Sequence, residues 1–436
     1  MTRGFLAPSS VLLQDRTRHG RSRSKIAAGG PPALDRSVPV LLMRIGHYPL
    51  HHGTVGAIRS LGRLGVPVYA VVEDPFAPAA RSRHLAGRFY WQTSGREAPD
   101  ELVQGLLRIG RMIGGRPILV TTDDEAAVLV AEQADRLRPS FILPATPPRL
   151  PRQLAGKHSL HWLCVEHGIP TPFSARPRSA ADALDIADTI GFPVVLKNDE
   201  PWLRLTRPAV ASTTLVRDRL ELRRVVASWS DMPSVIIQEY VPRERAHDWI
   251  AHAYFGEEVE HGVIFTGRKL RSWPPHAGVT TYAYTHLNAE VSRLTREVCR
   301  KAGFRGICDL DWRFDSLSGE YKLLDFNPRL GAQFRLFERE DGVDVVRALH
   351  LDLTGRDVPP GRQVDGRRYI VENLDVPAAI AYRRSGELEA IPLPCSHTEL
   401  AWCAADDPVP AVLGCVRSLA YRGGQMVKQR LSNTRP

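Results

Sequence analysis

One stretch near the carboxyl end of the chain, Tyr321–Glu338, has the apolar residues of a buried strand but also carries a carboxylate and a carboxamide, which are unusual in such a strand. Side chains of a strand alternate between two faces, so Asp325 and Asn327 share one face while apolar residues occupy the other. Pro328 ends the strand because it cannot donate a hydrogen bond to a neighbour, and Arg329 follows. Two hard oxygen ligands and a fixed cation at a strand end suit magnesium and phosphate groups.

The preceding segment supplies a partner for this strand. Ile307–Phe314 places Asp309 and Asp311 on one face, and Asp315–Glu320 has the composition of a turn, so the two strands are predicted to form a hairpin. Residues directly opposed across a hairpin share a face, which brings Asp309 or Asp311 close to Asp325. We favour Asp311, although the register depends on the turn type. A solvated polar face is the alternative interpretation.

The sequence DLDWRFD, a short turn and KLLDFNPR resemble the metal-binding end of the ATP-grasp superfamily. Within it, the chain is most similar to carboxylate–amine ligases of the D-aspartate ligase-like group, over about residues 38–350. The resemblance implies that Mg²⁺ and ATP are cofactors and that Asp311, Asp325 and Asn327 are the metal ligands. It also implies a role for Arg329 in balancing phosphate charge.

The alternation of apolar runs and helical patterns predicts an α/β fold. Val38–Met43 and Val66–Val72 read as buried parallel strands separated by a helix. Together with the resemblance, this predicts a parallel α/β domain, called the pre-ATP-grasp domain in the family, followed by an ATP-grasp domain with an antiparallel sheet and a small C-terminal extension. The predicted boundaries are a disordered basic tail over 1–37, the first domain over 38–150, the ATP-grasp domain over 151–355 with a lid over about 170–240, and the extension over 356–436.

Two lysines stand where the family has its phosphate-binding lysines. Lys157 opens a predicted helix that ends at Gly168, and a lysine there opposes the helix dipole unless an anion is nearby. Lys197 ends the predicted buried strand FPVVLK, where an ammonium group requires a partner. The family often has an acid before the first lysine, whereas this chain has Gly156.

Further nucleotide-binding residues follow from the resemblance alone. Glu239 and the backbone near Val241 match the positions that bind adenine, and Asp248 is placed to accept the ribose hydroxyls. Arg271, predicted to lie on a loop, matches the arginine that contacts the phosphate and the acyl group. His276 on the same loop is a weaker candidate.

The phosphate-covering flap departs from the family pattern. The corresponding stretch, Pro201–Thr214, contains no glycine, although backbone amides approach phosphates most closely at glycine. The side chains that offer an alternative phosphate contact are Arg204, Arg207, Ser212 and Thr213. Weakened ATP turnover is the other interpretation of this departure.

The first predicted domain offers weaker site candidates. His51 and His52 lie on a loop after the first strand, and one of them is a candidate for the substrate pocket, although a loop histidine is more often solvated. Asp123–Glu125 follows another strand and either faces the cleft or caps a helix. Helix capping is the more common use of such residues.

Composition limits the class of protein. The net charge is +10, and much of the basic excess falls in the first 36 residues without the aromatic pattern of RNA binding. The six cysteines show no metal-ligand or CxxC spacing, which predicts reduced thiols in a cytoplasmic protein. No apolar run approaches the length of a membrane span. We therefore expect neither nucleic acid nor membrane as a partner, and regard a homodimer as compatible with the sequence.

The predicted chemistry is ligation. Phosphorylation of a carboxylate by Mg-ATP gives an acyl phosphate, which an amine then attacks to form an amide or peptide bond. The expected substrates are small carboxylates and amines such as amino acids. The alternatives are another ATP-grasp enzyme, of the kinase or carboxylase type, and a nucleotide-binding relative with weakened catalysis.

Overall fold

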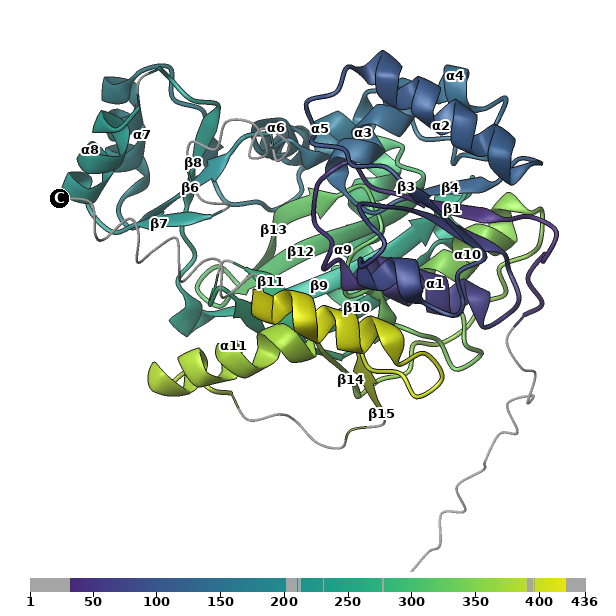
Figure 1. Cartoon of the computed structure of the whole chain (residues 1–436). Helices are drawn as coiled ribbons and strands as arrows, with labels where there is room; N and C mark the ends of the chain where they lie inside the picture. The colour runs from purple at the N-terminus through teal and green to yellow at the C-terminus, as the bar shows by residue number, and fades with distance from the viewer. Residues whose placement is uncertain are drawn as a thin grey trace, which may run out of the picture.

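The computed structural model describes residues 32–200, 210, 213–229, 231–276, 278–389, 395 and 397–420 (Figure 1). Most of the predicted basic tail over 1–37 lies outside these residues. Three sheets make up the fold: a parallel sheet, a small antiparallel sheet and a large sheet. The mixed α/β class predicted from the sequence is confirmed. Within the described ranges, no helix has the length and apolar character needed to cross a membrane.

The N-terminal sheet is parallel, with the strand order β3-β2-β1-β4. Its first strand is buried throughout, as expected for a strand covered on both faces. Helix α1 covers one face, and α2 and α3 cover the other. The strands are β1 (Val40–Met43), β2 (Val68–Val72), β3 (Gly87–Tyr90) and β4 (Ile118–Thr121). The helices are α1 (His52–Gly62), η1 (Pro78–Arg81), α2 (Pro99–Ile113), α3 (Asp124–Glu132) and α4 (Ala134–Leu137).

A small four-stranded antiparallel sheet with two helices forms a lobe beside the rest of the molecule (Figure 1). Its strand order is β5-β8-β6-β7. Ser179 and Asp218 cap its two helices by accepting hydrogen bonds from backbone amides three residues later. The elements are β5 (Ser174–Ala175), α7 (Ala180–Ile190), β6 (Val194–Asn198), β7 (Thr214–Val216), α8 (Arg219–Ala227) and β8 (Val235–Glu239).

The large sheet has seven strands in the order β13-β12-β9-β10-β11-β14-β15. The strands are β9 (Ala246–Phe255), β10 (Val263–Trp273), β11 (Val279–Thr285), β12 (Gly306–Asp315), β13 (Glu320–Asn327), β14 (Arg367–Ile370) and β15 (His397–Leu400). The helices around it are α5 (Leu150–Ala155), α6 (Lys157–His167), α9 (Ala289–Ala302), α10 (Val345–Leu353), α11 (Glu372–Arg384) and a helix over 409–420. Short 3₁₀ helices are η3 (Arg243–Arg245), η4 (Val259–His261) and η5 (Phe334–Leu336).

The two faces of the large sheet have different neighbours. Alternate residues of β9, such as Trp249 and Ala251, pack with apolar residues of α6 and α9. The residues between them, such as Ile250 and Tyr254, belong to the core shared with α10 and the N-terminal sheet. On β12, Leu310 lies in the α9 core, so its polar neighbours face the N-terminal sheet. The predicted metal-binding face is thereby turned toward the junction between the sheets.

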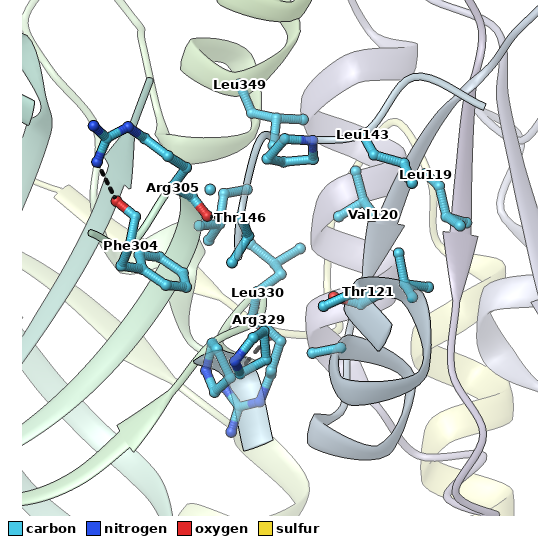
Figure 2. Close-up of a pocket in the computed structure, with 18 of the residues that line it drawn as sticks. Leu119, Val120, Thr121, Leu143, Thr146, Phe304, Arg305, Arg329, Leu330 and Leu349 are labelled. Carbon is cyan, nitrogen blue, oxygen red and sulfur yellow. Dashed lines mark hydrogen bonds between the residues drawn. The ribbon is translucent and has the colours of Figure 1, made fainter. Parts of the chain in front are cut away.

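A small cavity of about 70 Å³ lies at this junction, and Figure 2 shows the side chains that line it. Leu119 and Val120 of β4 lie on one side, and Phe304 and Arg305 lie on the other. Arg329 also borders this cavity, so the residue after the predicted metal-binding strand lies beside the N-terminal sheet.

Two sequence expectations need correction. Residues 269–273, predicted as a loop, belong to the long strand β10, because they pair with β11, a strand that was not predicted. The predicted C-terminal extension is not separate from the large sheet, since β14 pairs with β11 and β15 pairs with β14.

Candidate active site

The predicted hairpin of β12 and β13 is confirmed, and its register settles which acids face each other. Asp311 is paired with Asp325, and Asp309 is paired with Asn327. The pairing is regular from Asp309 to Asp311 and shifts only between Asp311 and Trp312, so alternation places these four polar residues on one face. Burial raises the pKa of Asp311, and the nearby carboxylates of Asp309 and Asp325 raise it further. A carboxylate crowded by carboxylates is a site that a cation would stabilise.

Lys157 and Lys197 converge on Asp325 from two different parts of the chain. The Nζ atom of Lys157, at the start of α6, lies 2.8 Å from Asp325 Oδ1, and that of Lys197, on β6 of the small lobe, lies 3.3 Å from it. Burial lowers the pKa of Lys197, and Lys157 lowers it further, while Asp325 opposes this. Burial alone would raise the pKa of Asp325, but the two ammonium groups hold it well below its usual value.

Asp309 anchors Arg329 rather than facing Asp325. Its Oδ2 accepts a hydrogen bond from Arg329 Nη1 at 2.9 Å, and its Oδ1 lies 3.0 Å from Nε2 of the fully buried His252. Burial would raise the pKa of Asp309, but His252 and Arg329 hold it below its usual range. Arg329 Nε also lies 3.5 Å from Oδ1 of Asp124, at the start of α3. Arg329 therefore joins the hairpin to the N-terminal sheet.

A cavity of about 460 Å³ opens between the hairpin and the N-terminal sheet. The hairpin and its exit contribute Asp309, Asp311, Asp325, Asn327 and Arg329 to its wall. The opposite wall comes from the loops after β1 and β4 and from the starts of α1 and α3 that follow them, and includes Arg44, His51, His52, Asp123, Asp124 and Glu125. Both histidines that the sequence left open thus border the cavity.

Asp123 combines the two uses that were weighed for the Asp123–Glu125 stretch. It caps α3, because its Oδ1 accepts a hydrogen bond from the Ala126 amide at 3.1 Å. It also lines the cavity, where its Oδ2 accepts hydrogen bonds from the amides of Ile45 at 2.9 Å and Gly46 at 2.6 Å.

Lys269 is a cavity residue that the sequence analysis missed. Its Nζ lies 3.7 Å from Asp311 Oδ1, and it lines the cavity beside Trp273. Burial would lower the pKa of Lys269, but the carboxylates of Asp311, Asp248 and Asp309 outweigh burial and raise it. No local signal marks Lys269, because it stands between Arg268 and Arg271 in a stretch with polar composition, unlike Lys197 at the end of an apolar run.

Arg271 does not lie with the other predicted residues. Its guanidinium donates hydrogen bonds of 2.9 and 2.7 Å to the carboxylate of Asp375 on α11, and it stacks over the ring of Tyr282. It is not among the residues that line the cavity. The phosphate contact expected for Arg271 stays a prediction, and it would require the guanidinium to leave its hydrogen bonds with Asp375. His276 likewise pairs outside the cavity wall, with Glu387 at 3.0 Å.

The residues predicted to bind the nucleoside contact basic side chains of the hairpin, farther from Asp325 along its strands. Glu239 lies 2.9 Å from Lys322, and Asp248 forms hydrogen bonds of 2.7 and 3.0 Å with Arg313. Arg313 also donates to the Val241 carbonyl at 3.1 Å. The structure therefore brings Glu239, Val241 and Asp248 to one side of the sheet, and their contact with adenine and ribose stays a prediction.

The donor set is compatible with magnesium. Two opposed carboxylates and the Asn327 amide supply hard oxygens. Burial raises the pKa of Asp311, Lys269 lowers it, and the carboxylates of Asp309 and Asp325 raise it, so a cation bound here would stabilise the ionised form of Asp311. Magnesium takes few protein ligands, because it keeps water and phosphate oxygens. Among the described residues, no group of three His, Cys, Asp or Glu side chains is arranged to hold a metal ion by itself. Most of the predicted flap, 201–209 and 211–212, lies outside the described residues.

The chain is similar in sequence to several ligases and synthases, and no family model matches it. It is 22% identical over 240 residues to the D-aspartate ligase of Enterococcus faecium, which covers 53% of this chain and 57% of that protein. It is also 22% identical over 331 residues to the carbamoyl phosphate synthase large chain of Thermus thermophilus, covering 72% of this chain and 30% of that protein. The matched regions are thus well short of the full length of either relative.

Solved structures share the fold at low sequence identity. The biotin carboxylase domain of the Hydrogenobacter thermophilus 2-oxoglutarate carboxylase, a dimer in complex with MgADP, ADP and bicarbonate, aligns with a TM-score of 0.55 and 14% identity, covering 74% of this chain and 71% of that chain. The L-amino acid ligase of Bacillus licheniformis aligns with a TM-score of 0.55 and 13% identity, covering 73% of this chain and 75% of that chain.

Proposed function

We propose that the chain is an ATP-dependent ligase of the ATP-grasp superfamily, which joins a carboxylate to an amine with release of ADP and phosphate. The substrates we propose are small molecules, with amino acids the first to test. The observation that carries the proposal is the convergence of Lys157 and Lys197 on Asp325, opposite Asp311.

The first step is phosphoryl transfer to a substrate carboxylate. A carboxylate oxygen attacks the γ-phosphorus of ATP, the bond to the bridging oxygen breaks, and ADP leaves with the electron pair. Magnesium held by Asp311, Asp325 and Asn327 would neutralise charge on the β- and γ-phosphates. Lys157 and Lys197 would release Asp325 in part and bind phosphate oxygens, because an ammonium group binds the more highly charged phosphate more strongly.

The second step forms the amide. The amine nitrogen attacks the carbonyl carbon of the acyl phosphate, phosphate leaves with the electron pair of the broken C–O bond, and the nitrogen loses a proton. Lys269 and Arg329 border the cavity beside the hairpin and would offset the negative charge that moves onto the leaving phosphate. No covalent intermediate with a protein side chain is required.

The test is ADP release with pairs of amino acids as substrates, followed by mass analysis of the product. We expect ADP to form together with a product whose mass is the sum of the two amino acids minus water. Asp325→Ala should abolish that release, because it removes the group on which both lysines converge. Arg111→Ala on the exposed face of α2 is the matched control and should leave the rate unchanged. Unchanged turnover in Asp325→Ala would exclude this site.

A carboxylase-type reaction is the second candidate. It is favoured by the similarity to a carbamoyl phosphate synthase and by the structural likeness to a biotin carboxylase domain. ADP release that requires bicarbonate, without a condensed amino-acid product, would support it over ligation.

A further inference from the structure

A second hollow, of about 680 Å³, lies between the start of α6 and the small lobe, and we call it the α6 groove. Helix α6 contributes His158 and Trp162 to its lining, and the lobe contributes residues 176–178, 232 and 233. None of these described residues lines the large cavity, so the groove is separate from the candidate active site. Its volume lies within the usual range of small-molecule sites.

Trp162 offers an aromatic face in this groove. The residue is 56% exposed, although a side chain of this size is usually largely buried. The indole is nevertheless held in place, because its Nε1 donates a hydrogen bond to Nε2 of His158 at 3.1 Å and its ring meets that of His161 edge-on. The indole is thus oriented but not covered, which suits it to stack on a flat ligand.

Two accessible guanidinium groups lie in the same groove. The Arg176 side chain is 51% exposed, and its Nη1 lies 3.6 Å from Asp199 Oδ2, which is too long for a hydrogen bond. The exposed Arg178 side chain has no hydrogen bond or ion pair with another described residue. The described lining contains no acid, so its positive charge is not balanced within the groove.

These side chains together indicate the class of ligand. A guanidinium binds phosphate through paired hydrogen bonds, and an exposed indole stacks on a planar ring. A simple carboxylate would leave the indole without a contact, and an apolar ligand would leave both arginines without an anion. A nucleotide supplies both parts, since it carries a planar base and phosphates on one sugar.

The groove is connected to the two lysines of the candidate active site through Asp199. The backbone carbonyl of Asp199 accepts a hydrogen bond from the Lys157 amide at 2.8 Å, and its Oδ1 accepts one from the His158 amide at 2.8 Å. Asp199 also directly follows β6, two residues after Lys197. An anion that draws Arg176 away from Asp199 therefore acts on the residue that holds the start of α6 to the end of β6.

We propose that the α6 groove is a second nucleotide-binding site, in which Trp162 stacks on the base and Arg176 and Arg178 bind the phosphates. Occupancy of the groove alters the positions of Lys157 and Lys197 through Asp199, so that the nucleotide acts as an effector as well as a substrate. Binding in the groove is independent of the proposed ligase activity, whereas the effect on turnover rests on it.

The first test is fluorine NMR of the full-length protein labelled with 5-fluorotryptophan. The resonance of Trp162 is the one that is missing from the spectrum of Trp162→Phe. We expect ATP to shift this resonance, and tripolyphosphate and adenosine to require roughly tenfold higher concentrations, because each lacks one of the two contacts. An unchanged resonance would overturn the proposal. Equal potency of tripolyphosphate or adenosine would overturn the assignment to a nucleotide.

Paired variants separate the groove from the candidate active site. Arg176→Met together with Arg178→Met removes two exposed charges and should raise the ATP concentration for half of the shift by roughly tenfold or more. Arg223→Met together with Arg224→Met, exposed on α8 of the same lobe, is the matched control and should leave the shift unchanged. A shift that persists in the first variant would report nucleotide bound elsewhere and overturn the proposal, as would an equal loss in the control.

Turnover tests the effect on the lysines. We expect the ATP dependence of ADP release to depart from a single hyperbola in the parent and to follow one in the Arg176 and Arg178 variant. The same curve in both proteins would overturn the connection through Asp199. If no substrate pair gave ADP release, the ligase proposal would fail, and the fluorine shift of Trp162 would still decide whether the groove binds a nucleotide.

Discussion

Two dense groups of buried charges in this molecule differ in how they are balanced. The first is the site cluster on the hairpin, made of Lys157, Lys197, Lys269, Asp309, Asp311, Asp325 and Arg329. The second is the junction cluster, which ties α10 and η5 to β14 and β15 and consists of Arg335, Glu338, Asp344, Arg347, Arg367 and Glu399. Both contain arginines and carboxylates within 4 Å of each other, so proximity alone does not separate a working site from a structural one.

The junction cluster is internally satisfied. Asp344 accepts hydrogen bonds from Ser60 and Arg335 at 2.6 Å each and from backbone amides of α10. Burial would raise the pKa of Asp344, but Arg347 and Arg335 lower it below its usual value. In the site cluster, by contrast, Asp311 faces Asp325 across the hairpin and has a raised pKa. Two carboxylates held opposite each other indicate a site where a bound cation would neutralise their repulsion.

The largest expected effect is on stability, at the junction cluster. Asp344→Ala removes the fully buried carboxylate of the cluster and leaves Arg335 and Arg347 with only Glu338 and Glu399 as partners, and breaking a buried ion pair in this way typically costs about 3–5 kcal/mol of unfolding free energy. Turnover per folded molecule should not change. Chemical denaturation together with active-site titration measures both quantities. If this variant lost turnover while keeping its stability, the junction cluster would not be purely structural, and the distinction between the two clusters would fail.

The next largest effect is on turnover, at the site cluster. Asp311→Asn removes a proposed magnesium ligand and should reduce ADP release by about 100-fold or more, the usual scale for losing one preorganised charge. Because it also removes repulsion with Asp325, the thermal midpoint in magnesium-free buffer should stay the same or rise. Differential scanning calorimetry measures that midpoint. A large fall in it would show that Asp311 is structural.

A smaller effect separates Asp309 from Asp311. Asp309 holds Arg329 and contacts His252, so Asp309→Asn should lower kcat by about tenfold through loss of one charge-assisted hydrogen bond. The magnesium concentration for half-maximal ADP release should rise in Asp311→Asn and stay unchanged in Asp309→Asn. A magnesium requirement that rises in both variants would make Asp309 a ligand as well.

The smallest expected effect concerns pH. As the pH falls, the contributions of Asp344 and Asp311 to the unfolding free energy change in opposite directions. The folded-state pKa of Asp344 lies below its ordinary value of 3.8, so its stabilisation is complete above that pH and is lost as the pH falls through the lowered pKa. The folded-state pKa of Asp311 lies above 3.8, so the fold is penalised at higher pH and the penalty disappears as the pH falls through the raised pKa. Unfolding free energies from pH 7 to pH 3 should therefore fall less steeply in Asp344→Asn than in the parent, and more steeply in Asp311→Asn. The same slope in both variants would contradict the assignment.

Local pattern was sufficient to predict the hairpin. Alternation along Ile307–Phe314 and from Tyr321 onward placed the polar residues of both strands on one face and left Asp309 and Asp311 open as the partner of Asp325. The register of the structure pairs Asp311 with Asp325, as we favoured. Helix starts were equally local, as the capping role of Ser179 shows. Local chemistry marked Lys157 and Lys197 as groups that need an anionic partner, the family resemblance suggested phosphate, and the structure brings both to Asp325.

Long-range pairing decided what local pattern could not. Strict alternation would place Lys269 and Arg271 on the same face of a strand, but the register of β10 against β11 shifts between them. The shift leaves Lys269 on the cavity side and directs Arg271 to Asp375, a partner more than a hundred residues away in the sequence. The groove beside Trp162 could likewise not be predicted from the sequence, because it forms only where the small lobe lies against α6.

The continuation of the large sheet through β14 and β15 bears on how far the chain can be shortened. A chain that ended near residue 355, where the sequence suggested a boundary, would lack β14 and α11. The edge of β11 would then be unpaired, and Arg271 would lose its partner Asp375. An uncovered edge strand and an orphaned guanidinium are both liabilities for solubility. Truncated versions that retain every proposed nucleotide contact would then aggregate, for reasons that have nothing to do with catalysis.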